Sequence, residues 1–262
     1  HYQTAYGVSV DPARIAVTTG SSGGFVLAFL SAFDAGDRVA LVSPGYPAYR
    51  NILTALDIEV VNIETGPETD FQPTPELLAQ VEGGLDGLII ASPSNPTGTM
   101  LDAAGLKALV DYCREHGIRL VSDEIYHGIT YERPAHTMAE FEPEAFVVNS
   151  FSKYYAMTGW RLGWLIFPES LARPIECLAQ NLFISPPTLS QIAAVSAFDA
   201  GEELDANVAR YKANRDLLLE ALPKAGFDKL SHAEGAFYVY ADVRSEERRV
   251  GKEWRGRVLG VA

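Results

Sequence analysis

Short apolar runs alternate with segments of helical period along most of the chain. The apolar runs that predict strands are residues 14–18, 38–42, 58–63, 85–91, 119–122, 146–149 and 162–167. The segments that predict helices between them are residues 25–33, 49–56, 75–81 and 103–116. Nearly continuous apolar strands separated by helices are typical of a mostly parallel sheet with helices on both faces. We therefore expect an α/β fold that binds its ligand at the carboxyl ends of the strands.

Composition and charge narrow the class of partner. The 262 residues are 47% apolar and 21% charged, as in ordinary globular proteins. With 21 basic and 34 acidic residues the formal net charge is −13, which argues against nucleic acid or an anionic membrane as partner. Cys113 and Cys177 stand in no metal or redox motif and predict reduced, packed side chains in a cytoplasmic protein without a metal site. Residues 1–3 have neither a methionine nor a signal-peptide form, so we expect the chain to begin within a longer protein.

Polar and glycine-rich segments follow several of the predicted strands. Gly-Ser-Ser-Gly-Gly at residues 20–24 opens a predicted helix, so its N–H groups and the hydroxyls of Ser21 and Ser22 could hold an anion. Asn95 lies in a loop that two prolines hold rigid, and its amide can both donate and accept. Tyr46, in a Ser-Pro-Gly-Tyr-Pro turn, either presents an aromatic face to a ligand or packs as an ordinary loop tyrosine.

Two ionisable side chains stand where a predicted strand ends. Asp123 follows the strand 119–122 and would be costly to bury without a cationic partner; Tyr126 lies three residues on. Lys153 follows an apolar run and precedes Arg161 by eight residues, in a segment rich in aromatic residues: Phe151, Tyr154, Tyr155 and Trp160. Desolvation and a nearby cation would lower the pKa of this lysine, giving the amine that Schiff-base chemistry with a carbonyl requires. An ordinary surface lysine is the alternative.

Together these side chains describe one ligand, an aromatic ring with a protonated nitrogen, a phenolic oxygen, an aldehyde and a phosphate. Asp123 would pair with the ring nitrogen, and Asn95 and Tyr126 would hold the phenolic oxygen. Tyr46 would stack on the ring, and Lys153 would form a Schiff base with the aldehyde. The phosphate would be bound by Arg161, Ser150, Ser21 and Ser22. That ligand is pyridoxal 5′-phosphate.

The same segments resemble those of the class I and II aminotransferases, which have the aspartate-aminotransferase-like fold. In this chain they read S-P-G-Y-P, S-P-S-N-P-T-G, S-D-E-I-Y, S-F-S-K and M-T-G-W-R-L-G-W, in the order of that family. The resemblance covers residues 2–243, roughly. It implies a pyridoxal-phosphate enzyme that moves an amino group between an L-amino acid and a 2-oxo acid by a ping-pong mechanism, with Lys153, Asp123 and Tyr126 as catalytic residues.

The resemblance also implies a domain organisation. Residues 1–203 would form a large cofactor-binding domain with a seven-stranded, mostly parallel sheet. Residues 204–243 would form a connector helix, from about 204 to 222, and the beginning of a small domain, with a strand at 235–242. A homodimer is implied as well, whose sites lie near the subunit interface, with the apolar, proline-rich run 181–187 approaching the cofactor site of the partner.

The chain departs from the family pattern at both ends. The N-terminal arm that helps to cover the substrate is missing before His1, and nothing matches the small-domain arginine that binds the substrate carboxylate. Residues 244–262 are dense in charge and lack an apolar period, and R-S-E-E-R-R-V-G-K-E resembles the translation of a sequencing adapter. We therefore expect a non-native tail; a solvated basic tail is the alternative.

Two other functions are compatible with parts of this pattern. A carbon–sulfur β-lyase of the same fold would use the same aspartate, lysine and arginine; the G-W-R-L-G-W and P-S-N-P-T-G segments favour transfer. A transcription regulator with an aminotransferase-like sensing domain typically carries E-D-D-Y where this chain has S-D-E-I-Y, and would show a helix-turn-helix module upstream.

Overall fold

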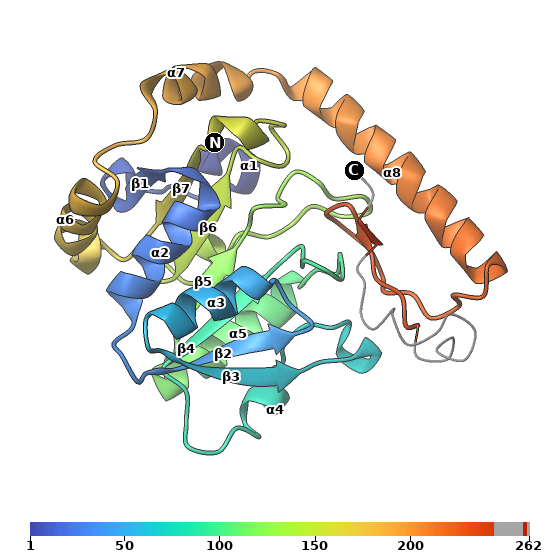
Figure 1. Cartoon of the computed structure of the whole chain (residues 1–262), viewed down its shortest axis with the longest axis horizontal. Coiled ribbons are helices and arrows are strands. Elements are labelled where there is room, and N and C mark those ends of the chain that lie inside the picture. Colours follow the sequence, from blue (N-terminus) through green and yellow to red (C-terminus); the bar gives the residue numbers. More distant parts are fainter. Residues whose placement is uncertain (244–258, 261–262) are drawn as a thin grey trace.

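A seven-stranded sheet forms the centre of the molecule (Figure 1). The computed structural model describes residues 1–243 and the backbone of 259–260. The strands are β1 Ile15–Thr18, β2 Arg38–Ser43, β3 Glu59–Glu64, β4 Gly87–Ala91, β5 Arg119–Asp123, β6 Phe146–Ser150 and β7 Gly163–Ile166. Their order is β1-β7-β6-β5-β4-β2-β3, and β7 alone among them runs antiparallel to its neighbours. This confirms the mostly parallel sheet that the sequence predicted.

Helices cover both faces of the sheet. They are α1 Tyr2–Tyr6, α2 Gly20–Ala32, α3 Pro47–Ala55, α4 Pro75–Leu78, α5 Ala103–His116, α6 Ala172–Leu182, α7 Thr188–Ala197 and α8 Gly201–Lys224. Short 3₁₀ helices lie at Pro12–Arg14, Pro67–Thr69, Met138–Glu140, Thr158–Trp160 and Glu169–Leu171. Among the described residues, no helix has both the length and the apolar character needed to cross a bilayer.

Successive residues of a central strand enter two separate cores. Leu88 and Ile90 of β4 belong to a cluster with Leu106 and Leu109 of α5, whereas Ile89 packs in the cluster that holds Phe25 and Phe29 of α2. This division follows from the pleat, which points alternate side chains to opposite faces. Each such buried side chain contributes about 1.5–3 kcal/mol. The continuous apolar runs are therefore the sequence signature of strands buried on both faces.

Parallel pairing brings the polar strand ends to one edge. In the register of β4, β5 and β6, Ala91 pairs with Asp123 and Asp123 pairs with Val148. The loop that follows β4, the carboxylate that ends β5 and the turn after β6 therefore meet at the carboxyl edge of the sheet. The segments that the sequence singled out are brought together by this register.

Two predicted elements have different bounds in the structure. The Gly-Ser-Ser-Gly-Gly segment is the first turn of α2, which begins at Gly20, and not a turn that precedes the helix. The strand expected at 235–242 is only β8, Tyr238–Val239, because Ala236 has a left-handed φ of 56° that interrupts an extended chain. α6 and α7 were not predicted.

The last part of the chain leaves the sheet along one long helix. α8, orange in Figure 1, runs along the outside of the molecule and leads to β8, which pairs antiparallel with β9, Leu259–Gly260. The expected connector helix is therefore present and is a few residues longer than predicted. The suspected non-native tail lies outside the described residues except for the backbone of β9.

Candidate active site

A cavity of about 200 Å³ opens at the carboxyl edge of the sheet. It gathers every side chain that the sequence proposed for the cofactor except Ser150: Ser21, Ser22, Tyr46, Asn95, Asp123, Tyr126, Lys153 and Arg161. It is also lined by residues that were not predicted: Phe25, Ile125, Ser152, Thr158 and Tyr238. Side chains from six separate segments of the chain thus converge on one space large enough for a small molecule.

Asp123 is a buried carboxylate at the floor of the cavity. Its side chain accepts hydrogen bonds from the backbone N–H of Ile125 at 3.0 Å and from the hydroxyl of Tyr49. Burial raises the pKa of Asp123 to about 6, although these hydrogen bonds and Lys153 act in the opposite direction. Among the described residues, no lysine or arginine forms an ion pair with it. A ligand that brings a protonated nitrogen would supply the missing cation.

Lys153 lies in the turn after β6, and its amine is held between aromatic rings. Nζ is 5.6 Å from the centre of the Tyr126 ring and 5.5 Å from that of Phe237. Burial lowers the pKa of this lysine, and Arg161 lowers it further, whereas Asp123 raises it. The amine is therefore closer to its neutral, nucleophilic form than that of a surface lysine.

The aromatic surroundings of Lys153 differ from those expected. Phe151 and Tyr155 pack with Trp164 in the core, and Trp160 is 47% exposed. Tyr126 and Phe237 contact the amine instead. Because these two rings come from distant segments, neighbours in the sequence could not identify them.

The donors at the start of α2 form an anion site with Arg161. The side chain of Thr19, the residue before α2, makes no capping hydrogen bond. The first backbone N–H groups of the helix, beside Ser21 and Ser22, therefore have no such partner and can donate to a ligand. Arg161 donates to the carbonyl of Thr158 at 3.0 Å, which fixes the guanidinium next to Gly20. A Cβ at Gly20 would lie 2.7 Å from Nη2 of Arg161, so a larger residue there would displace the guanidinium. A helix N-terminus, hydroxyls and a guanidinium are the donor set that a phosphate requires.

Ser150 does not line the cavity. It is 1% exposed, and its Oγ accepts a hydrogen bond from the N–H of Ser152 at 3.1 Å. Its role in this structure is to shape the turn that leads to Lys153, while the side chain of Ser152 takes the place at the cavity wall. Ser150 lies at the end of β6, and its hydroxyl oxygen is engaged by this turn.

Tyr238 enters the cavity from the segment that follows α8. Its hydroxyl lies 2.6 Å from the hydroxyl of Tyr126, and the two rings meet edge to face. The surrounding backbone is fixed because Gly235 donates to the carbonyl of Gly98 at 2.9 Å. No local signal predicted this residue; only the tertiary fold brings it to Tyr126.

The described part of the chain holds no group of three or more histidine, cysteine, aspartate or glutamate side chains that could bind a metal ion. The cavity presents an amine, a carboxyl group, phenols and an anion site. Together these groups fit a phosphorylated aromatic aldehyde with a basic ring nitrogen.

The known proteins that are similar to this chain are named as aminotransferases. The family described as aminotransferase class I and II matches residues 1–255. The valine–pyruvate aminotransferase of Mycobacterium tuberculosis is 55% identical over 246 residues, which are 92% of this chain and 63% of that protein. The aspartate/prephenate aminotransferase of Thermus thermophilus is 36% identical over 242 residues, which are 90% of this chain and 63% of that protein.

Solved structures agree with these relatives. The crystal structure of an aminotransferase from Mycobacterium tuberculosis superposes with a TM-score of 0.91 at 55% identity, covering 93% of this chain and 64% of that one. The structure of an aminotransferase from Silicibacter pomeroyi, described as putative, superposes with a TM-score of 0.90 at 53% identity. The chain thus spans a little less than two thirds of the length of these relatives.

Proposed function

The chain belongs to the class I and II aminotransferase family, and on that premise we propose that the protein uses pyridoxal 5′-phosphate to move an amino group from an L-amino acid to a 2-oxo acid. The observation that carries this proposal is the convergence of Asp123, Lys153 and Arg161 on one cavity. They are a carboxylate, an amine of lowered pKa and a guanidinium, the three groups that this cofactor needs. When bound, the cofactor supplies an electron sink for the carbanion that forms at the substrate Cα.

The cavity residues divide the binding of the cofactor among them. Arg161, Ser21 and Ser22 would bind the phosphate at the N-terminus of α2, and Ser152 would serve there in place of Ser150. Asp123 would pair with the ring nitrogen, which keeps both groups charged in a buried place. Asn95 and Tyr126 would donate to the phenolic oxygen, and Tyr46 would cover one face of the ring.

Lys153 would have two roles in sequence. Its amine would hold the cofactor by the aldehyde carbon until the amino group of the substrate takes its place. The freed amine would then serve as the base that removes a proton from the substrate Cα and as the acid that returns it. Because burial and Arg161 lower the pKa of Lys153, the amine can accept and return this proton near neutral pH.

The names of similar proteins indicate which amino donors to test first. Similar proteins carry the names valine–pyruvate aminotransferase and aspartate/prephenate aminotransferase, so valine and aspartate are the first donors to compare. The β-lyase alternative would use the same cavity groups, and no comparison favours it. A homodimer, a cytoplasmic location and a place in amino acid metabolism are parts of the same proposal.

Half-transamination tests the proposal. The intact protein, loaded with pyridoxal phosphate, should convert its bound cofactor to the pyridoxamine form when an accepted amino acid is added, which removes the visible absorbance band. A panel with valine, aspartate and S-alkyl cysteine separates transfer from β-elimination, because elimination releases a thiol and leaves the band. Release of thiol without loss of the band would favour the lyase, and no spectral change with any donor would reject the function.

A further inference from the structure

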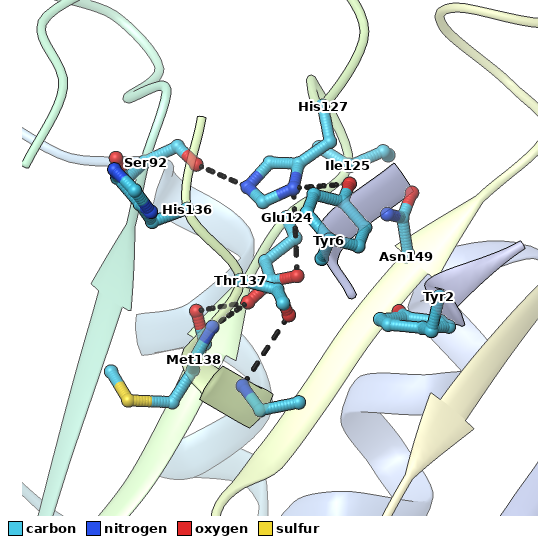
Figure 2. A network of polar contacts seen from close by, with 12 residues as sticks. Tyr2, Tyr6, Ser92, Glu124, Ile125, His127, His136, Thr137, Met138 and Asn149 are labelled. Carbon is cyan, nitrogen blue, oxygen red and sulfur yellow. Dashed lines mark hydrogen bonds and ion pairs between the residues drawn. The ribbon is translucent and has the colours of Figure 1, made fainter. Parts of the chain in front are cut away.

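The turn that ends β5 carries two buried ionisable side chains that the proposed reaction does not use. Asp123 and Tyr126 line the cavity, whereas Glu124 and His127 do not. Glu124 is 1% exposed and His127 is 6% exposed. Figure 2 shows them pointing toward one another, with Tyr6 of α1 beside the imidazole. Within one short turn, two side chains face the cavity and two face the interior.

The imidazole of His127 joins two segments that carry cavity residues. Its Nε2 lies 2.9 Å from the carbonyl oxygen of Ser92, so this nitrogen carries a proton and donates. Nδ1 is then the acceptor, and the hydroxyl of Tyr6 donates to it at 2.8 Å. Ser92 opens the loop that carries Asn95, and His127 directly follows Tyr126. The imidazole therefore fixes the position of Asn95 relative to Tyr126.

The carboxyl group of Glu124 has one well-satisfied oxygen and one bare oxygen. Oε1 accepts from the N–H of Met138 at 2.7 Å and from the hydroxyl of Ser122 at 3.1 Å. Oε2 is buried without a hydrogen-bond partner among the described residues and lies 3.6 Å from Nδ1 of His127. A carboxylate with a bare buried oxygen is costly, whereas a protonated Oε2 carries no charge that would need such a partner. This donor pattern indicates a neutral acid.

The charges around the pair agree with this geometry. Burial raises the pKa of Glu124 to about 8 and lowers that of His127 to about 4, so both are neutral near pH 7. Within the described residues, no lysine or arginine forms an ion pair with either side chain. The other titratable groups that act on the pair or its hydrogen-bond partner are Asp123, Tyr2, Tyr6, Tyr155, His136 and Glu140.

We propose that Glu124 and His127 form a positioning pair that sets the spacing of Asn95 and Tyr126, with Glu124 acting as a neutral acid. A neutral Glu124 leaves Asp123 as the single negative charge at the end of β5. A second anion one residue away would raise the pKa of Asp123 and weaken its pairing with a ring nitrogen. This inference rests on the proposed function in one respect, namely that Asn95 and Tyr126 hold the phenolic oxygen of pyridoxal phosphate.

Variants of His127 test the positioning role in the intact protein. His127→Phe keeps the ring shape but removes both nitrogens, and should weaken binding of pyridoxal phosphate about tenfold or more. It should also shift the pH midpoint of the bound cofactor's absorbance, because Tyr126 and Asn95 lose their spacing. His127→Gln restores a donor toward Ser92 and should recover most of both effects. The matched control is His116→Phe, on the exposed face of α5.

Glu124→Gln tests the protonation state. The amide is uncharged and presents its oxygen to Met138 and Ser122, as the neutral acid does, so the affinity and the midpoint should stay close to those of the wild type. Infrared spectra of the protein without cofactor at pH 7 should show a carboxylic acid C=O stretch that this variant lacks. Absence of that band, or a shift in Glu124→Gln as large as in His127→Phe, would overturn the neutral acid.

Two further results test the positioning role of His127 and the proposed function. Unchanged affinity and midpoint in His127→Phe would reject the positioning role; if this variant does not fold, the same measurements on His127→Gln against Tyr6→Phe decide it. A wild-type protein that binds no pyridoxal phosphate would reject the proposed function, and with it the role of Asn95 and Tyr126. The infrared band would still decide whether Glu124 holds its proton.

Discussion

Asp123 and Lys153 lie in one cavity, and each changes the charge state of the other. Burial is the first cause of both shifts: it raises the pKa of Asp123 to about 6 and lowers the pKa of Lys153. Their mutual attraction opposes burial in both cases. A ring cation beside Asp123 would restore its charge, and covalent use of the lysine would remove a cation from the cavity. The charge states of Asp123 and Lys153 therefore suit a ligand that brings a cation and an aldehyde, and not an ion pair between the two side chains.

Asp123→Ala should separate binding of the cofactor from its use. Arg161 and Lys153 remain, so some pyridoxal phosphate should stay bound. The rate of proton removal from Cα should fall about a hundredfold or more, because an unprotonated ring is a poorer electron sink. Single-turnover absorbance measurements report this rate, with Asp111→Ala on the exposed face of α5 as the control. Near-normal turnover would make Asp123 a structural carboxylate.

Lys153→Ala should abolish covalent attachment of the cofactor. After borohydride reduction, mass spectrometry should find pyridoxyl label on Lys153 in the wild type and none in the variant. Half-transamination should fall about a thousandfold or more, since the variant lacks both the anchor and the base. Lys107→Ala, on α5, is the matched control. Transamination at the parental rate in Lys153→Ala would contradict both roles.

Glu124→Gln should remove a pH-dependent part of the folding free energy. The pKa of Glu124 is about 8 in the folded protein against an ordinary value of 4.5. Because the folded state binds this proton more tightly, the contribution is fully present below pH 4.5 and is lost as the pH rises through 8. Asp123, with a pKa of about 6, acts in the same way at lower pH. The difference between the wild type and Glu124→Gln from pH 6 to 8 therefore reports on Glu124.

Denaturant unfolding of the cofactor-free protein at pH 6, 7 and 8 measures this effect. The wild type should lose about 1 kcal/mol per pH unit across the window, and Glu124→Gln should lose much less. His127, with its pKa lowered to about 4, contributes in the opposite sense and only below its ordinary 6.5. Equal slopes for the two proteins would mean that Glu124 is ionised throughout.

At the scale of the element, boundaries were predictable where a local signal marks them. α5 spans the predicted residues 103–116 because Asp102 caps its first turn and Gly117, with φ 69°, ends it. The start of α2 was placed too late because glycine and serine at 20–24 are typical of a turn. The left-handed φ of Gly20, 76°, and its contact with Arg161 show why a glycine stands at the start of this helix.

Gly20→Ala should damage the anion site at the start of α2. Gly20 has φ 76°, and its Cβ would lie 2.7 Å from Nη2 of Arg161. Gly36→Ala is the matched control, since Gly36 has φ 90° but no atom within 4 Å. Both should lose about 1–2 kcal/mol of stability from backbone strain. Only Gly20→Ala should also weaken binding of pyridoxal phosphate, about tenfold; equal affinities would place the phosphate elsewhere.

At the scale of the whole molecule, the sequence could predict which segments carry the site but not all of its walls. Asn95 and Lys153 stand in segments with their own signals, and the parallel register brings those segments together. Tyr49 and Tyr238 carry no such signal, and they meet Asp123 and Tyr126 only through the tertiary fold. The sequence does not show how Ser150 is used, because its distance from Lys153 along the chain is the same whether its side chain faces the cavity or the turn.

The exposed apolar side chains of the molecule indicate how it assembles. Large apolar side chains are exposed on α6, α7 and the loop between them: Leu182, Ile184, Leu189, Ile192 and Val195. Ile184 is 84% exposed and has a left-handed φ of 62°. On α7 the apolar positions recur every three residues and form one stripe. Exposed large apolar side chains in such number are typical of an interface between subunits.

We expect the intact protein to be a symmetric dimer that buries this stripe, and the double variant Ile184→Asp, Ile192→Asp to be monomeric. Two carboxylates in an apolar interface cost several kcal/mol, enough to raise the dimer dissociation constant more than about a hundredfold. Light scattering across a concentration series measures the state, with Leu217→Asp on α8 as an equally exposed control. A wild-type monomer at working concentration would reject the dimer. A variant that remains dimeric would place the interface on another face, and loss of cofactor affinity on dissociation would show that the partner subunit supports the site.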